Sequence, residues 1–189
     1  MSTKDITYIA LFTAIYAVLG LFPPINLPFF LGVPITAQSM GPMLAGSILG
    51  AKRGILASVL FLLLVAVGLP LLSGGHGGIS VFLGASGGYL IGFPFAALFI
   101  GFMAELFWQR LNFIILFVIN VVGGIGIVYL FGIPWMAYIT KVSLLNSLII
   151  SSGFMIGDIL KVLLSCSIAL AVKKSSPLIL AKKEECRFE

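Results

Sequence analysis

The chain has 189 residues, of which 60% are hydrophobic and 9% are charged, with a formal net charge of +5. A soluble domain carries about 25% charged residues, so these side chains are too few to cover a surface in water. The composition therefore indicates an integral membrane protein. From this length we expect residues 1–189 to form a single membrane domain, without a separate soluble catalytic domain.

Apolar runs that could form membrane-spanning helices occur six times along the chain. A helix needs about 20 residues to cross roughly 30 Å of hydrocarbon. The predicted spans are Ile6–Phe22, Ile35–Gly50, Gly54–Leu72, Gly87–Phe107, Leu111–Phe131 and Ser147–Val172. The second run is short and contains Gly41 and Pro42, so we expect a tilted or broken helix there. The sequence predicts an all-α membrane protein with six transmembrane helices.

Basic residues are concentrated in alternate connections between these spans. Those on one side of the predicted membrane include Lys4, Lys52, Arg53, Arg110, Lys173 and Lys174. The three opposite connections contain only Lys141. Because loops rich in lysine and arginine stay in the cytoplasm, both termini are predicted to be cytoplasmic in a multi-pass protein of the cell membrane. Residues 173–189 are predicted to form a short basic cytoplasmic tail.

Two charged side chains, Asp158 and Lys161, lie within the sixth predicted span. Placing an ionisable group at membrane depth costs at least ~2.5–3.5 kcal/mol, so such residues usually face a partner, a cavity or a ligand. At a spacing of three they share a helix face, and Ser147 and Ser151 extend this polar side towards the extracellular end. The pair either neutralises itself for insertion or provides a negatively charged acceptor and a cationic donor in a binding pocket.

Two further features surround this predicted pocket on the extracellular side. Gln38 places an amide just inside an apolar helix, where it needs a partner on another helix or a ligand. The connection Ser73–Ser86 is rich in glycine, which permits tight folding over a site, and Tyr89 follows it with a ring and a hydroxyl. Tyr89 could equally serve in packing alone.

The sequence contains no motif that indicates catalysis or a bound metal. The glycine clusters lack the lysine and the hydroxyl residue that a phosphate-binding loop requires. His76 has no cysteine, aspartate or glutamate near it in the chain, which is atypical of a metal site. We therefore expect no catalytic residue, no metal and no cofactor.

Several segments follow one another in an order that is typical of one family. They are Val33–Gln38, Gly46–Gly54, Gly68–Gly78, Leu83–Phe93 with its Gly-Gly-Tyr-Leu-Ile-Gly-Phe sequence, and Gly157-Asp-Ile-Leu-Lys161. In this order they resemble the BioY family, the biotin-binding S components of energy-coupling-factor (ECF) transporters. The resemblance runs from the first to the sixth span. The chain departs from the family pattern at Ala37, at Ala85 and Ser86, and at Ile156.

The resemblance implies high-affinity capture of biotin from outside the cell and its uptake by an ECF-type ABC transporter. Biotin would be the transported substrate, with Asp158 accepting from its ureido N–H groups. Lys161 would donate to the ureido oxygen or pair with the carboxylate. The remaining expected ligand-binding residues are Gln38, Ser86, Tyr89 and Phe93.

The resemblance also implies partners. Ala10 and Ala14 in the first span resemble the small-residue motif by which S components dock on a transmembrane coupling subunit. Two cytoplasmic ATPases would then drive release of the vitamin inside the cell.

Three other functions remain open at this point. The first is an S component for another vitamin, because the fold is shared and only pocket residues discriminate. A cationic vitamin such as thiamin is disfavoured by Lys161. The second is an intramembrane enzyme, which would need a catalytic constellation at the cytoplasmic interface. The third is a proton-coupled carrier that uses Asp158.

Overall fold

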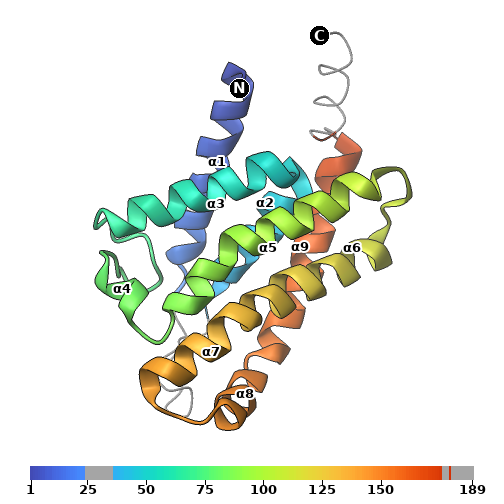
Figure 1. Ribbon diagram of the computed structural model, residues 1–189. Coiled ribbons are helices and arrows are strands. Elements are labelled where there is room, and N and C mark those ends of the chain that lie inside the picture. The colour runs from blue at the N-terminus through green and yellow to red at the C-terminus, as the bar shows by residue number, and fades with distance from the viewer. Residues whose placement is uncertain (24–35, 176–178, 180–189) are drawn as a thin grey trace.

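The computed structural model describes residues 1–23, 36–175 and 179. Residues 24–35, which include the start of the second predicted span at Ile35, and most of the predicted tail lie outside the described residues. The described part of the chain folds into a bundle of helices (Figure 1). It contains no β-strand, only one isolated bridge between Leu72 and His76. The predicted all-α fold class is thus confirmed.

Helices occupy all six predicted positions. In chain order they are α1 (Thr3–Gly20), the 3₁₀ turn η2 (Ala37–Ser39), α2 (Met40–Leu49), α3 (Ala51–Ala66), α4 (Ser80–Leu83), α5 (Gly87–Leu106), the 3₁₀ turn η3 (Trp108–Arg110), α6 (Phe113–Asn120), the π-helical segment η4 (Val121–Ile127), α7 (Val128–Thr140), α8 (Leu144–Ser152) and α9 (Met155–Ser175).

The fifth and sixth spans differ from their predicted bounds. The fifth is one continuous helix, Phe113–Thr140, made of α6, η4 and α7. Trp135 and Tyr138, which follow the predicted end of this span at Phe131, therefore lie inside α7. The sixth is broken after α8 at Gly153, a residue with low helix propensity. The buried Phe154 follows, and its carbonyl accepts from Asp158 N at 2.9 Å as α9 begins.

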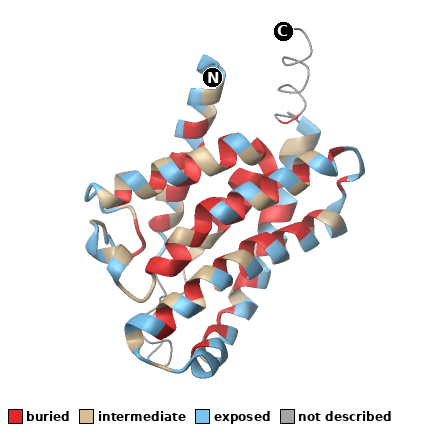
Figure 2. Ribbon diagram, in the orientation of Figure 1, coloured by how far each residue is buried: buried red, intermediate tan, exposed pale blue. Residues whose placement is uncertain are grey.

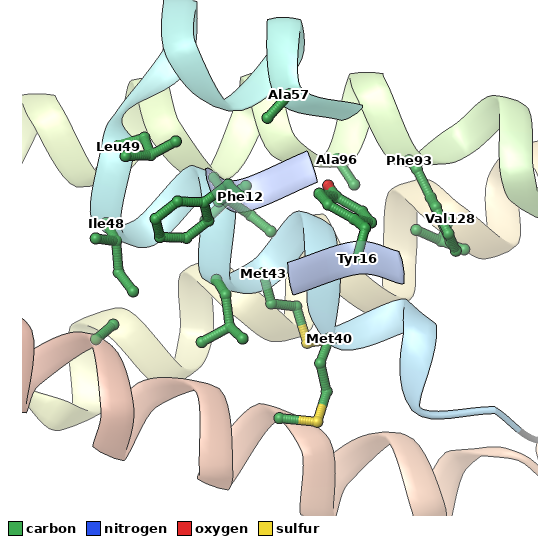
Figure 3. Packing of buried hydrophobic residues seen from close by; sticks show 14 of the residues in the cluster. Phe12, Tyr16, Met40, Met43, Ile48, Leu49, Ala57, Phe93, Ala96 and Val128 are labelled. Carbon is green, nitrogen blue, oxygen red and sulfur yellow. The ribbon is translucent and has the colours of Figure 1, made fainter. Parts of the chain in front are cut away.

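The short helix α2 lies at the centre of the bundle. It packs against α1, α3, α5 and α9, and all ten of its residues are buried. Figure 3 shows Met43 of α2 among side chains from neighbouring helices, including Tyr16 of α1. Gly41 permits the contact with α1, because a Cβ there would lie 2.2 Å from the Tyr16 ring. Pro42 lies in the first turn of α2, where proline is tolerated, and α2 is not broken there.

Figure 2 shows exposed residues along the outer helices of the bundle. Many of these residues are large and apolar. Examples are Leu63 of α3, Phe102 of α5 and Ile114 of α6. In lipid such a surface is expected, because the hydrocarbon is as apolar as these side chains. Three helices, Gly87–Leu106, Phe113–Thr140 and Met155–Ser175, are long and apolar enough to cross a membrane. The six-span arrangement is compatible with this architecture.

The start of α1 and the end of α9 lie at the same end of the bundle (Figure 1). We call this the terminal end. The opposite end carries α4, α8 and the end of α7 (Figure 1). Because α9 runs from the opposite end to the terminal end, its first turn, with Asp158, lies on the half of the bundle remote from the termini.

Candidate functional site

The centre of the candidate site is the ion pair within α9. Lys161 Nζ donates to Asp158 Oδ1 at 2.8 Å, and the side chains are 13% and 8% exposed. Asp158 lies in the first turn of α9, where the helix dipole favours a negative charge. The break at Gly153 produces this position, because a continuous sixth helix would have placed Asp158 in its interior.

Tyr129 of α7 makes the second side-chain hydrogen bond to the Asp158 carboxylate, and this contact was not predicted from the sequence. Its hydroxyl donates to Asp158 Oδ2 at 2.7 Å and lies 3.4 Å from the Ser151 carbonyl oxygen. Each oxygen of Asp158 therefore has a donor. The available signal was a tyrosine in the middle of an apolar span, where its hydroxyl cannot reach water and must find a partner.

Ser39 was also missed, and it joins the pair from the other side of the bundle. Lys161 Nζ donates to Ser39 Oγ at 3.0 Å. Ser39 ends the 3₁₀ turn η2, which leads into the central helix α2. The ammonium thus connects α9 to η2. No local sequence signal links these two residues, which are 122 positions apart.

Tyr89 of α5 lies beside Tyr129. The two rings meet edge to face with centroids 6.0 Å apart, and the Tyr89 hydroxyl lies 2.9 Å from Ser151 Oγ. Ser151 and Ser147 are both fully buried. Ser147 Oγ makes no hydrogen bond to any described residue, which is uncommon for a buried polar atom. A chain of hydroxyl groups therefore extends from Asp158 towards the end opposite the termini.

Gln38 is adjacent to Ser39, but its amide bonds the connection after α3. Its Nε2 donates to the Leu71 carbonyl oxygen at 2.9 Å, and its Oε1 accepts from Ser73 N at 3.1 Å. Gly74, Gly75 and Gly78 give this connection its turns through positive φ angles of 83°, 73° and 91°. Gln38 thus anchors the glycine-rich connection beside the ion pair.

Ser86 and Phe93 lie on α5 with Tyr89 between them, and no contact between either residue and the ion pair is seen. Ser86 is half-buried at the start of α5, and its carbonyl oxygen accepts from Leu90 N at 3.2 Å. Phe93 is buried, and its ring centroid lies 6.4 Å from that of Tyr16. The structure therefore brings Asp158 and Lys161 together and links Tyr89 to them through Tyr129 and Ser151. Gln38 is next in the chain to Ser39, which bonds Lys161, and Ser86 and Phe93 are not joined to the pair by a contact between described residues.

The two alanines of the predicted docking motif, Ala10 and Ala14, are both exposed on α1. The opposite face of the helix packs inwards through Phe12, Thr13 and Tyr16. Among the described residues, no cluster of histidine, cysteine, aspartate and glutamate could hold a metal ion. What this arrangement offers chemically is a buried, neutral pair of opposite charges with hydroxyl groups on one side.

Comparisons with known proteins agree on one family. The model of the BioY family matches residues 1–178. The biotin transporter BioY of Rhizobium etli is 40% identical over 187 residues, covering 96% of this chain and 100% of that protein. The probable biotin transporter BioY of Bacillus subtilis is 43% identical, covering 90% of this chain and 91% of that protein.

A solved structure is similar over the whole fold. It is the crystal structure of the S component for biotin from an ECF-type ABC transporter, which matches with a TM-score of 0.90 and 36% sequence identity. The match covers 95% of this chain and 98% of that one. Since these relatives are transporters, the intramembrane enzyme considered from the sequence is excluded. The chain belongs to the BioY family.

Proposed function

We propose that this protein captures biotin from outside the cell as the substrate-specific subunit of an ECF-type ABC transporter. The named function of its relatives and the likeness to a biotin S component support this proposal. Biotin is then the transported substrate, and no cofactor takes part.

The observation that carries the proposal is the unused hydrogen-bonding capacity of the buried ion pair. An ammonium has three donors and a carboxylate about four acceptor sites. Lys161 directs donors to Asp158 and Ser39, and Asp158 accepts from Lys161 and Tyr129. Among the described residues, one donor of Lys161 and about two acceptor sites of Asp158 therefore have no partner, and they are free for a ligand.

A ureido group matches this remaining capacity. It carries N–H donors next to a carbonyl oxygen, so Asp158 accepts from a ureido N–H while Lys161 donates to the ureido oxygen. Both are charge-assisted hydrogen bonds, which are stronger than neutral ones. Because Asp158 already balances the charge of Lys161, a neutral group suits this position better than the valerate carboxylate or a cationic ring such as that of thiamin.

The other expected ligand residues line the rest of the proposed site. Tyr89 provides a ring and a hydroxyl on the side of Ser151 and Ser147, and the free hydroxyl of Ser147 is suited to a polar ligand atom. Phe93 packs against the apolar part of the ligand, and Gln38 and Ser86 complete the polar lining.

Transport requires partners beyond this chain. We propose that α1 docks through Ala10 and Ala14 on a transmembrane coupling subunit, and that two cytoplasmic ATPases drive release. Both termini are then cytoplasmic. The exposure of both alanines supports this role, since small residues let helices approach closely in lipid.

The proposal is tested by isothermal titration of the purified chain with biotin, beside thiamin and riboflavin. We expect one-to-one binding of biotin alone, and its loss in Lys161→Ala. Biotin methyl ester is included because it lacks the carboxylate charge. If it also binds and also depends on Lys161, then Lys161 contacts the ureido end. Absence of heat with all three vitamins, from folded and monodisperse protein, would exclude the proposed substrate.

Docking is tested separately with Ala14→Trp. Because the side chain at this position is exposed, we expect biotin binding in detergent to be unchanged while ATP-driven uptake in cells that contain the coupling module is blocked. Loss of binding in detergent would instead show that the substitution disturbs the packing of α1 inside the bundle.

A further inference from the structure

Tyr129 and Lys161 together fix the orientation of the Asp158 carboxylate. Its hydroxyl holds Asp158 Oδ2 at 2.7 Å while Lys161 holds Oδ1 at 2.8 Å. With a donor on each oxygen, the carboxylate cannot turn about its terminal bond without losing a charge-assisted hydrogen bond. Its plane, and with it the direction of the remaining acceptor sites, is set by these two donors.

Tyr129 is itself held from two directions. Its ring meets the Tyr89 ring edge to face, and its hydroxyl also lies near the Ser151 carbonyl oxygen. Tyr89 is in turn held by Ser151 Oγ at 2.9 Å. The donor that meets Asp158 therefore comes from a ring whose position is determined by α5 and α8 as well as by α7.

The π-helical segment η4 explains how Tyr129 comes to face α9. The long fifth helix touches α9 at Asn120, whose Nδ2 lies 3.7 Å from Cys166 Sγ, and again at Tyr129. In a regular α-helix, which turns by about 100° per residue, residues nine positions apart face nearly opposite sides. A π-helical turn takes up one extra residue, which removes about 100° of this rotation and lets both side chains face α9.

The glycines of η4 fit this interpretation. A Cβ at Gly124 would lie 2.4 Å from Met43 Cε, and one at Gly123 would lie 2.4 Å from Ile100 Cγ1. The segment thus packs closely against α2 and α5 while its backbone departs from regular α-helical geometry. The segment ends at Ile127, two residues before Tyr129, and π-helical turns occur frequently at functional sites.

We propose that Tyr129 is a positioning residue of the ligand site, which orients the Asp158 carboxylate so that its free acceptor sites meet the N–H donors of the ligand. This inference rests on the proposed function, since it assigns Tyr129 a role in recognition of the ureido group. It acts through Asp158, without requiring that the Tyr129 hydroxyl touch the ligand.

The test is Tyr129→Phe, which removes the hydroxyl and keeps the ring. We expect the affinity for biotin to fall roughly 10- to 100-fold, the range for a lost hydrogen bond to a charged group. The matched control is Tyr16→Phe. Tyr16 is fully buried, and its hydroxyl bonds Ser58 Oγ, outside the site, so this control is expected to keep the affinity for biotin.

A second measurement separates positioning from general packing. The chain has only two aspartates, Asp5 and Asp158, so protein labelled with ¹³C at the aspartate carboxyl carbon gives two carboxylate bands in the infrared. Comparison with labelled Asp158→Asn identifies the band of Asp158. Without ligand, we expect Tyr129→Phe to shift this band and Tyr16→Phe to leave it unchanged.

The outcomes are distinct. An affinity drop together with the band shift supports the proposal. Unchanged affinity overturns it, and so does an affinity drop without a band shift, because Tyr129 would then act by direct contact or through packing. If the wild-type chain binds no biotin, the proposed function fails, whereas the band still reports whether Tyr129 holds Asp158.

Discussion

Two charged side chains at the terminal end of the bundle, Glu105 and Lys173, have partners of a different kind from those in the site. Both bond helix ends: Glu105 Oε1 of α5 accepts from Ala51 N at the start of α3, at 2.9 Å. Lys173 of α9 donates to the carbonyl oxygens of Trp108 and Leu111, at 2.9 and 3.0 Å. In the site, by contrast, Asp158 and Lys161 bond each other and the side chains of Tyr129 and Ser39.

The contacts at the terminal end and those in the site differ in whether the fold needs them. Backbone groups at helix ends lack partners within their own helix, so Glu105 and Lys173 satisfy groups that would otherwise need water. Within the described part of the chain, the side chains of Asp158 and Lys161 bond no backbone group of a neighbouring helix. Their burial is costly and their removal as a pair need not destabilise the fold. The comparison therefore predicts that charges of the terminal end serve stability and that the pair in α9 serves binding.

The strongest test of this comparison removes both charges of the site together. We expect Asp158→Asn with Lys161→Met to lower the affinity for biotin roughly 1,000-fold or more, because two hydrogen bonds to charged groups are lost, each contributing about 1.5–3 kcal/mol. The melting temperature without ligand should stay near that of the wild type, since no unpaired charge is left in the bundle. Titration and thermal unfolding of the same preparation measure both.

The single variant Asp158→Asn serves as the control. It leaves the buried Lys161 without its carboxylate partner, so we expect it to lose affinity and also to melt below the double variant. A double variant that melts far below both the wild type and the single variant would show that the pair stabilises the fold, and the contrast between the two ends would fail.

At the terminal end, we expect Glu105→Ala to act only on stability. The side chain caps α3 from another helix, because Gly50 at the N-cap position offers no side-chain cap. Loss of a cap costs about 1 kcal/mol, which corresponds to a melting temperature lower by about 2–4 °C for a chain of this size. Thermal unfolding measures this, and titration with biotin should give the wild-type affinity.

Glu105→Gln keeps an acceptor oxygen at the same place and should recover part of the lost stability. A fall in biotin affinity in Glu105→Ala, at unchanged stability, would show that the terminal end is coupled to the site and would contradict the separation of roles.

Much of the fold could be predicted because the features that determine it are local. Apolar runs, and the glycine, proline and charged residues between them, place helices at all six positions. The spacing of Asp158 and Lys161 predicts their shared face, and the structure shows them bonded. The break at Gly153 was not predicted, since the apolar run of the sixth span continues through it. The full length of α7 was not predicted either, since Pro134 lies inside this helix.

The partners of the ion pair, Tyr129 and Ser39, could not be predicted because they depend on how distant helices pack against α9. Tyr129 faces Asp158 only through the π-helical segment η4, and a pattern based on 3.6 residues per turn misplaces it. Ser39 meets Lys161 because α2 is short and central, which follows from packing in the whole bundle. For Gln38, the need for a partner was predicted, and which groups satisfy it was not.

The smallest expected effect concerns Asp5, which precedes the first apolar run. Ser2 N donates to Asp5 Oδ2 at 2.9 Å, and Arg53 Nε lies 2.5 Å from Asp5 Oδ1. The backbone hydrogen bond from Ser2 lowers the pKa of Asp5 below its usual range, with the Arg53 guanidinium acting in the same direction and burial opposing both. A carboxyl group whose pKa is lower in the folded chain stabilises the fold above its ordinary pKa, and this contribution is lost as the pH falls through the lowered value.

Asp5→Asn should therefore reduce stability by less than about 1 kcal/mol at pH 7, as is typical of ion pairs near a surface. The difference from the wild type should shrink as the pH falls below the ordinary pKa of an aspartate, about 3.9, because the wild-type carboxyl is then protonated as well. Thermal unfolding of both proteins across this range measures the difference. A difference that stays constant with pH would mean that the carboxylate charge contributes nothing, and that the substitution acts only through the shape of the cap at the start of α1.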